Sequence, residues 1–512
     1  MNATVNQLER AVALPKVSIH PWISDQGDGT YQNPVLCADY SDPDVIRVGE
    51  DFYLTASSFN CTPGLPILHS RDLVNWTLVN HALKNLPDAR YEKFQPGGGV
   101  WAPALRFQAG KFWIFFSTPD EGIYFTTADH PAGQWSEPHL VQAGRGLIDP
   151  CPFWDDDGQA YLVHAYAGSR AGIKHRLRVC PMAADGSKLL GAGEIVFHDP
   201  ENQPTIEGPK FLKRDGWYYL LAPAGGVTTG WQLALRSKNI YGPYEAKTVL
   251  AQGRTNINGP HQGALVDTLG GEWWFVHFQD AGVYGRITHL QPARWENGWP
   301  LIGVDGEPVR HHAKPRTSKP EKICAPPATD EFETGRLGLQ WQWNANHGEG
   351  WYSLAARPGW LRLFSRPAAP PLAELPHLLL QKFPAWNFAA EARLEFLPRQ
   401  PGEQAGIIVA GRTFAALTLR RGMDGNELVF HHNGPSVVLF KTARSAARFR
   451  VRVAEGGTCR FEFLFDGAGW QAVPELFQAQ PGFWIGAKLG IFATAPVGQV
   501  SGHADFDYFR FI

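Results

Sequence analysis

Three acidic side chains stand far apart in the sequence, each in a short phrase that contains proline. They are Asp42 in Ser-Asp-Pro-Asp, Asp149 in Ile-Asp-Pro and Glu207 in Ile-Glu-Gly-Pro. Aspartate and glycine favour turns, so a single phrase of this kind would mark only the end of a strand. Carboxylates that cluster repel one another, so one can keep its proton near neutral pH while another stays ionised. Hydrolysis of a glycosidic bond needs such a pair, an acid for the leaving oxygen and a carboxylate that activates water.

The three phrases belong to a weak internal repeat over residues 30–310. Each unit has a signature residue, then a glycine turn and then an aromatic strand, as in His261, Gly270-Gly271 and residues 273–276. The signature residues of the five units are Asp42, Trp101, Asp149, Glu207 and His261. Four short strands in every ~40–50 residues are typical of a β-propeller blade. The repeat therefore predicts a five-bladed propeller, whereas unrelated hairpins in a sandwich would not repeat this order five times.

In a propeller the innermost strand of each blade lines the central channel. The signature precedes the first turn of its unit, so it belongs to that strand, and residues at equivalent positions are expected to meet at the axis. Asp42, Asp149 and Glu207 would then form one carboxylate cluster, with Trp101 as an apolar wall for a sugar ring. Carboxylates at the same phase in three of five units favour a catalytic site over three ordinary strand ends.

Composition excludes several classes of function. The 512 residues include 47 Lys and Arg against 49 Asp and Glu, a net charge of −2, which argues against nucleic-acid binding. The six cysteines form no Cys-x-x-Cys pair, so neither a zinc knuckle nor a disulfide scaffold is predicted. No run approaches 18 apolar residues, and residues 1–22 lack the apolar centre of a signal peptide. We expect a cytoplasmic protein that does not bind membranes; a secreted protein that has lost its leader is the alternative.

Changes in composition and in the apolar–polar pattern along the chain predict an all-β architecture, a five-bladed β-propeller followed by a β-sandwich domain. Residues 1–29 are expected to be an N-terminal extension, 30–310 the propeller, and the basic, proline-rich 311–328 a linker. From 329 to 512, runs such as 392–396 and 449–453 alternate apolar with polar residues. This period of two is typical of half-buried antiparallel strands and indicates the sandwich.

Five stretches together resemble glycoside hydrolase family 43. They are SDPDVIRVGEDFYLTASSF, GGVWAPALRF, LIDPCPFWDDDG, IEGPKFLKRDGWYYLL and YGRITHLQPARW. The chain is most similar to the β-xylosidase and α-L-arabinofuranosidase branch with a C-terminal concanavalin-like β-sandwich, and the similarity runs from Tyr31 almost to the end. The ordered set of three carboxylate motifs is specific to the family, although any one of them alone would be weak.

The resemblance implies a role for each carboxylate. Asp42 matches the general base that activates water, Glu207 the general acid, and Asp149 the carboxylate that tunes and orients the acid. Asp44, in the same phrase as Asp42, would have no catalytic role under this alignment. The expected mechanism inverts the anomeric centre, with Asp149 keeping Glu207 protonated by like-charge repulsion and the acid and base ~6.5–9.5 Å apart.

Other expected site residues would bind the sugar. By the resemblance, Arg286 in Gly-Arg-Ile-Thr binds sugar hydroxyls beside the base, and Phe59 and Trp101 form hydrophobic walls; Trp231 is a further candidate for sugar contact. His261 lies where some members place a histidine near a hydrated calcium at the propeller axis, and a hydrogen-bonded channel histidine without metal is the alternative. The chemistry itself requires no cofactor.

The expected activity is release of terminal β-D-xylosyl residues from xylooligosaccharides by an exo-acting enzyme. An α-L-arabinofuranosidase, or dual activity on arabinose-decorated polysaccharide, is the alternative, because loops 60–63 and 225–231 depart from the family's xylosidases and are expected to shape the pocket. A retaining fructosidase would need Asn before the first aspartate, where this chain has Ser41. A non-catalytic sugar-binding protein would lack one carboxylate. The β-sandwich is expected to close one side of the pocket, with a carbohydrate-binding module as the alternative, and a homo-oligomer is left open.

Overall fold

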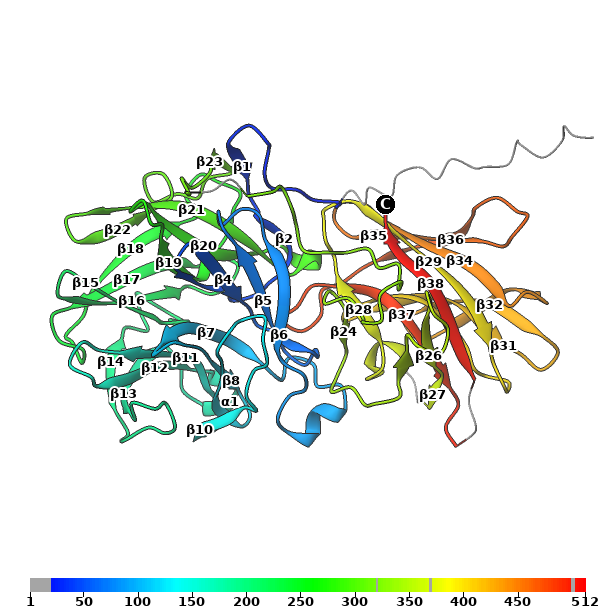
Figure 1. The fold of residues 1–512 in the computed structure, drawn as a ribbon, viewed down its shortest axis with the longest axis horizontal. Helices are drawn as coiled ribbons and strands as arrows, with labels where there is room; N and C mark the ends of the chain where they lie inside the picture. Colours follow the sequence, from blue (N-terminus) through cyan, green and yellow to red (C-terminus); the bar gives the residue numbers. More distant parts are fainter. Residues whose placement is uncertain (1–19, 319–320, 368–370, 499–501) are drawn as a thin grey trace, which may run out of the picture.

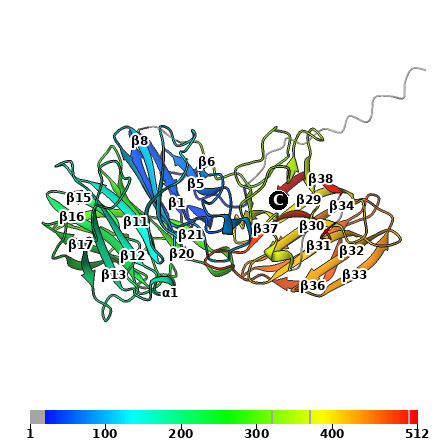
Figure 2. The same cartoon turned by 90° about the horizontal axis from the view of Figure 1, so that it is seen from below.

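The computed structural model describes residues 20–318, 321–367, 371–498 and 502–512, so most of the predicted N-terminal extension lies outside the described residues. Two β-domains lie side by side, a propeller coloured blue to green and a sandwich coloured yellow to red (Figures 1 and 2). The predicted all-β class and the order of the two architectures are confirmed. None of the helices in these ranges is long and apolar enough to cross a membrane.

The propeller has five blades, as the repeat predicts: four are four-stranded sheets and the fifth is a five-stranded sheet. Blade one contains β3 (Asp44–Val48), β4 (Asp51–Thr55), β5 (Gly64–Ser70) and β6 (Thr77–Leu83). Blade two contains β7 (Trp101–Gln108), β8 (Lys111–Thr118), β9 (Gly122–Ala128) and β10 (His139–Ala143). Blade three contains β11 (Leu147–Trp154), β12 (Ala160–Tyr166), β13 (Arg176–Met182) and β14 (Glu194–His198). Blade four contains β15 (Lys210–Arg214), β16 (Trp217–Ala224), β17 (Trp231–Ser237) and β18 (Glu245–Ala251).

Blade five closes the ring by combining the two ends of the propeller sequence. It contains β19 (His261–Asp267), β20 (Trp273–Asp280) and the long β21 (Arg286–Glu296). One end of β21 pairs with β2 (Leu36–Asp39), and the other end pairs with β22 (Trp299–Ile302). Nearby, β1 (Thr30–Gln32) pairs with β23 (His311–Ala313), within the segment predicted as a linker. Because β2 leads directly into Asp42, this closure brings Asp42 beside Arg286.

A residue in left-handed backbone conformation lies within three positions of the start of each innermost strand. These residues are Asp42 (φ 53°), Ala102 (φ 26°), Asp149 (φ 58°), Gly208 (φ 58°) and Gln262 (φ 39°). Proline follows the first four and Gly263 follows the fifth. In blades two, three and five the pairing register also shifts at this point, which is the mark of a β-bulge. Proline suits such a site because it needs no N–H partner in the ladder.

The repeated bulge corrects the predicted alignment of the five units. Asp42 and Asp149 occupy the left-handed position themselves. Trp101, Glu207 and His261 each lie one residue before it. The five signature residues therefore occupy two positions relative to the bulge, and not one equivalent position. The sequence pattern missed this difference because it does not reveal which residue of each phrase carries the bulge.

The sandwich packs an eight-stranded sheet against a seven-stranded sheet. The first contains β24 (Gln342–Trp343), β28 (Leu379–Lys382), β37 (Lys488–Ala495), β30 (Gln404–Ala410), β31 (Phe414–Arg421), β32 (Asn426–His432) and β33 (Ser436–Thr442), with β27 (Arg366–Pro367) beside β37. The second contains β25 (Tyr352–Ser353), β26 (Leu361–Phe364), β38 (His503–Phe511), β29 (Phe388–Leu397), β34 (Ala446–Val453), β35 (Thr458–Leu464) and β36 (Gln471–Gln478). Phe449, Val451 and Leu417 lie in the core between the sheets, as the alternation predicts for β34.

Candidate active site

A cavity of about 590 Å³ lies where the innermost strands of the blades begin. Six of the predicted site residues line it: Asp42, Phe59, Trp101, Asp149, Glu207 and Arg286. Its size is in the usual range for a small-molecule site. The chain thus brings together side chains that are up to 244 positions apart in sequence.

Asp42 is buried and held by donors from three directions. Its Oδ2 accepts from the hydroxyls of Ser57 at 2.5 Å and Ser41 at 2.8 Å. Arg286 Nη1 donates to Oδ1 at 3.2 Å and to the Ser41 hydroxyl at 2.9 Å. Ser57 in turn accepts from the Ala102 N–H at 2.7 Å, which fixes its rotamer. A carboxylate with charged and hydroxyl donors is firmly oriented, as a base that positions water must be.

Asp149 is the buried centre of the carboxylate cluster. Burial, together with the neighbouring charges of Glu207 and Asp42, raises the pKa of Asp149 well above its usual value. Its Oδ2 accepts from the Gly208 N–H at 2.7 Å. Because Gly208 follows Glu207 directly, this bond fixes the backbone that carries the Glu207 side chain. Burial therefore favours the protonated form of Asp149.

Glu207 lies just before β15 and is 27% exposed, so its carboxyl can reach both the cavity and the protein. Its Oε1 is 2.9 Å from Nε2 of His261, which belongs to the next blade and is fully buried. The imidazole therefore fixes one oxygen of Glu207. The predicted alternative of a hydrogen-bonded channel histidine describes this contact.

The calcium ion at the axis stays a prediction. His261 Nδ1 is buried without a hydrogen-bond partner, so the imidazole could offer one nitrogen. Calcium prefers six to eight oxygen ligands, and no three His, Cys, Asp or Glu side chains gather as a metal site in the described ranges. These residues do not fit a calcium ion caged by protein groups.

Aromatic rings from both domains form the walls of the cavity. Phe59 and Trp101 have ring centroids 6.5 Å apart, and Trp101 is anchored by its indole N–H to the Gly97 carbonyl at 3.1 Å. Trp484 of the sandwich, in the loop between β36 and β37, lines the same cavity. Its ring lies 6.4 Å from Trp101 and 5.4 Å from the Arg286 guanidinium carbon. The sandwich therefore closes one side of the cavity, as expected from the sequence.

Sequence reasoning did not find Trp484. The only signal is an aromatic pair, Phe483-Trp484, in the glycine- and proline-rich stretch 481–486, and both rings remain about half exposed. An exposed large aromatic pair in a loop could have been flagged as a candidate. The contact of Trp484 with Trp101 could not have been predicted, because only the docking of the two domains brings Trp484 to the propeller. Lys174 and Tyr166 of blade three also line the cavity unpredicted.

Trp231 and loop 60–63, both expected to shape the pocket, do not line the cavity as predicted. Trp231 does not line the cavity: its indole N–H donates to Gln203 Oε1 at 2.8 Å, and its ring packs so closely on Gly225 that a Cβ there would be 2.6 Å away. Of loop 225–231, Gly226 and Val227 reach the cavity. Loop 60–63 instead anchors the sandwich, since the Asn60 side chain donates to the Asn344 carbonyl at 2.7 Å.

Asp44 is occupied by a structural ion pair. It is fully buried, and its Oδ2 accepts from the Leu105 N–H at 2.6 Å and from Arg106 Nη1 at 2.7 Å. It does not line the cavity. Within the phrase Ser-Asp-Pro-Asp, only the first aspartate therefore faces the space where a substrate could bind.

The arrangement can carry acid–base chemistry on a neutral ring-shaped ligand. One oriented carboxylate (Asp42), two further acidic side chains (Asp149 and Glu207) and one guanidinium share a cavity with aromatic walls. Aromatic faces suit the apolar faces of sugar rings, and carboxylates and guanidinium suit their hydroxyls.

Comparison with known proteins agrees with this geometry. Residues 31–300 match the family Glycosyl hydrolases family 43, and residues 329–512 match the Beta xylosidase C-terminal Concanavalin A-like domain. The chain is 41% identical over 483 residues to the "Putative beta-xylosidase" of Xylanibacter ruminicola, covering 92% of this chain and 87% of the relative. It is 31% identical to the non-reducing end α-L-arabinofuranosidase of Bacteroides ovatus, with 94% of both chains covered.

Among solved structures, the xylan β-1,4-xylosidase from Bacillus halodurans is similar over both domains. The TM-score is 0.84 at 27% identity, covering 94% of this chain and 99% of that one. The catalytic and C-terminal domain matches together account for nearly all of the described residues. The chain belongs to family 43 of the glycoside hydrolases.

Proposed function

We propose that this glycoside hydrolase is an inverting, exo-acting β-xylosidase that removes terminal β-D-xylosyl residues from xylooligosaccharides. The observation that carries the proposal is the meeting of Asp42, Asp149, Glu207 and Arg286 in one cavity. The names of relatives support the choice of sugar, because a β-xylosidase of Formosa agariphila and a xylan 1,3-β-xylosidase of a Vibrio species are 31% and 32% identical to this chain.

In the proposed reaction, Glu207 gives its proton to the departing glycosidic oxygen. Asp42 takes a proton from a water molecule on the opposite face of the sugar, and the hydroxide oxygen forms the new bond to the anomeric carbon. Arg286 keeps Asp42 oriented and is free to bind a sugar hydroxyl with its remaining N–H groups. Asp149 fixes the Glu207 segment by accepting the Gly208 N–H. The exo mode is supported by Trp484, which narrows the cavity from the sandwich side.

Two measurements test this proposal. Proton NMR during hydrolysis of an aryl β-xyloside should show the α-anomer of xylose first; initial formation of the β-anomer would contradict inversion. Kinetics on matched aryl β-D-xyloside and aryl α-L-arabinofuranoside should give the higher kcat/KM for the xyloside.

The second candidate is an α-L-arabinofuranosidase, alone or with dual activity. It is favoured by the Bacteroides ovatus relative and by a "Xylosidase/arabinosidase" of Butyrivibrio fibrisolvens, which is 27% identical to this chain. The same side-by-side assay separates the candidates. A larger kcat/KM for the arabinofuranoside would replace the first proposal with the second.

A further inference from the structure

The two domains meet at a tight junction directly beside the catalytic cavity. The Ala487 N–H of the sandwich donates to the Val283 carbonyl of the propeller at 2.8 Å. The Gly456 N–H donates to the Tyr284 hydroxyl at 2.8 Å. Two backbone segments, 283–286 of the propeller and 486–487 of the sandwich, therefore run against each other.

One buried carboxylate ties these segments together. Asp39, the last residue of β2, accepts the Arg286 N–H at Oδ1 (2.9 Å) and the Gly486 N–H at Oδ2 (3.0 Å). It is 5% exposed and does not line the cavity. A buried carboxylate is costly unless its oxygens are hydrogen-bonded. Here each oxygen serves a different domain, so the group acts as a bridge between them.

Two glycines show how closely the segments approach. A Cβ at Gly285 would lie 2.5 Å from the Asp39 carboxyl carbon, and a Cβ at Gly486 would lie 2.6 Å from the Tyr284 carbonyl carbon. Real Cβ atoms do not come this near to backbone or to a fixed carboxyl. Neither position has room for a side chain, so the junction holds the two backbones in one relative placement.

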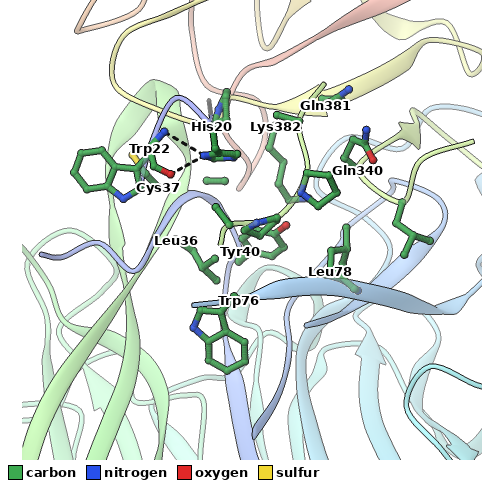
Figure 3. Close-up of a pocket in the computed structure, with 18 of the residues that line it drawn as sticks. His20, Trp22, Leu36, Cys37, Tyr40, Trp76, Leu78, Gln340, Gln381 and Lys382 are labelled. Atoms are coloured by element: carbon green, nitrogen blue, oxygen red, sulfur yellow. Dashed lines mark hydrogen bonds between the residues drawn. The ribbon is translucent and has the colours of Figure 1, made fainter. Parts of the chain in front are cut away.

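The surroundings of Asp39 do not form a ligand site. Beside it, a cavity of only about 50 Å³ lies between the domains, and Lys382 of β28 extends into it toward Tyr40 (Figure 3). The Lys382 ammonium is 5.1 Å from the Tyr40 ring centroid and donates to Gln342 Oε1 at 2.9 Å. Such a space holds a few water molecules and no sugar.

Two cavity residues flank the junction in sequence. Arg286 follows Gly285 directly, and Trp484 precedes Gly486 by two residues. Their side chains meet in the cavity, where the guanidinium carbon is 5.4 Å from the Trp484 ring. We propose that Asp39 is a positioning residue that sets the placement of Trp484 against Arg286 and so couples the β-sandwich to the catalytic cavity. The inference rests on the proposed function only in the reaction used to measure it.

A double-mutant cycle tests the coupling. Asp39→Asn keeps the side-chain shape but replaces one acceptor oxygen with an NH₂ group that faces an N–H donor. We expect KM for the preferred aryl glycoside to rise about tenfold with kcat changed less than about threefold, because a wall moves and the reacting groups do not. In a Trp484→Ala background, Asp39→Asn should change KM less than twofold. An equal loss in both backgrounds would overturn the inference, because coupled residues are non-additive.

A matched control separates positioning from stability. Asp330 of the sandwich also accepts backbone N–H groups, from Phe332 at 2.9 Å and Gly338 at 3.2 Å, and it does not line the cavity. Asp330→Asn should lower Tm without changing KM. If KM of Asp330→Asn rose as much as KM of Asp39→Asn, the effect of Asp39→Asn on KM would be explained by general destabilisation, and the inference would be overturned. If Asp39→Asn does not fold, Gly486→Ala, whose Cβ pushes on Tyr284, replaces it in the same cycle.

A readout that does not need activity keeps this inference separate from the proposed function. In hydrogen exchange followed by mass spectrometry, peptides covering 482–488 and 283–288 should exchange faster in Asp39→Asn than in the wild type, and not in Asp330→Asn. Unchanged exchange in both segments would overturn the inference. Failure of the wild type to cleave either aryl glycoside would overturn the proposed function alone.

Discussion

Nε2 of His261 lies 2.9 Å from Oε1 of Glu207, across the boundary between blades five and four. The histidine is fully buried and the glutamate faces the cavity. An imidazole at this distance restrains the proposed acid to one rotamer, which matters because a proton donor must stand within hydrogen-bond reach of the leaving oxygen. The same contact leaves only Nδ1 for a metal.

Removing this imidazole should therefore weaken catalysis without a metal being involved. For His261→Ala we expect kcat to fall about 10–100-fold, the cost of a catalytic group displaced by ~1 Å. The measurement is kcat with and without EDTA, followed by added calcium. The variant should lose the same factor under all conditions. If EDTA brought the wild type down to the level of the variant, His261 would instead act through calcium.

The proposed acid can be identified by its dependence on the leaving group. Glu207→Ala should cost about 10²–10⁴-fold in kcat/KM on xylobiose, whose leaving oxygen needs a proton. On a dinitrophenyl xyloside, whose leaving group departs as an anion, the loss should be less than about tenfold. Equal losses on both substrates would remove Glu207 from the acid role.

Replacing Asp149 should raise the stability of the fold at neutral pH and lower the activity. Its pKa is raised in the folded protein by burial and by Glu207 and Asp42. The folded state therefore binds this proton more tightly than the unfolded chain, and stability falls as pH rises from the unfolded pKa near 3.8 through the raised folded value. Asp149→Asn removes the ionisation, so its Tm should exceed that of the wild type at pH 7.5, and the gain should shrink as pH falls.

Differential scanning fluorimetry at pH 7.5 and pH 5 measures this, alongside activity, which we expect to drop at least about 10²-fold. A variant less stable than the wild type at pH 7.5 would mean that the carboxylate is stabilising in the fold, contrary to the raised pKa.

The two aspartates of Ser-Asp-Pro-Asp should behave in opposite ways. Asp42→Ala should lose activity by at least about 10³-fold, because the proposed base is gone, with a smaller loss of stability because Arg286 keeps the Ser41 hydroxyl as an acceptor. Asp44→Ala should instead destabilise the protein by about 3–5 kcal/mol, since it removes the buried carboxylate that pairs with Arg106 and accepts the Leu105 N–H. Urea unfolding and kcat on the same preparations separate the two effects. Full activity in Asp42→Ala would refute the assignment of the base.

Trp484 should affect binding more than chemistry. Trp484→Ala opens one wall of the cavity, so KM for an aryl glycoside should rise about tenfold with a smaller change in kcat. Phe483→Ala is the matched control: it removes the neighbouring ring, which lines a different cavity between the two domains. Its KM should stay within about twofold of the wild type. Equal effects of the two variants would point to loss of the loop rather than of the wall.

The blades were predictable because their signals are local. A turn glycine such as Gly110 followed by an aromatic strand marks a hairpin without reference to the rest of the chain. The ring closure was not predicted, because the pairing of β2 with β21 joins residues about half the chain apart and leaves no local pattern.

The site was predicted where acidic side chains recur at the start of the repeat units, as at Asp42, Asp149 and Glu207, all of which line the cavity. The prediction of the site failed where backbone conformation or the docking of the two domains decides which residues reach the cavity. The left-handed residue at Ala102 or Gly208 shifts the phase by one position, and no residue of the sandwich predicts that Trp484 will meet Trp101. Trp231 shows the converse, since an aromatic in a loop close to the site is used for packing.

The closing strand also sets an order for assembly. β2 is synthesised before any blade, yet it pairs with β21, the last long strand of the ring. A growing chain therefore carries Asp149 and Glu207 on finished blades while Asp42 still lacks Arg286. Contacts of this length form late, since their loops are the most costly to close. Asp42 and Arg286, the proposed base and the arginine that orients it, therefore come together last, and a chain that ends before β21 lacks this pair.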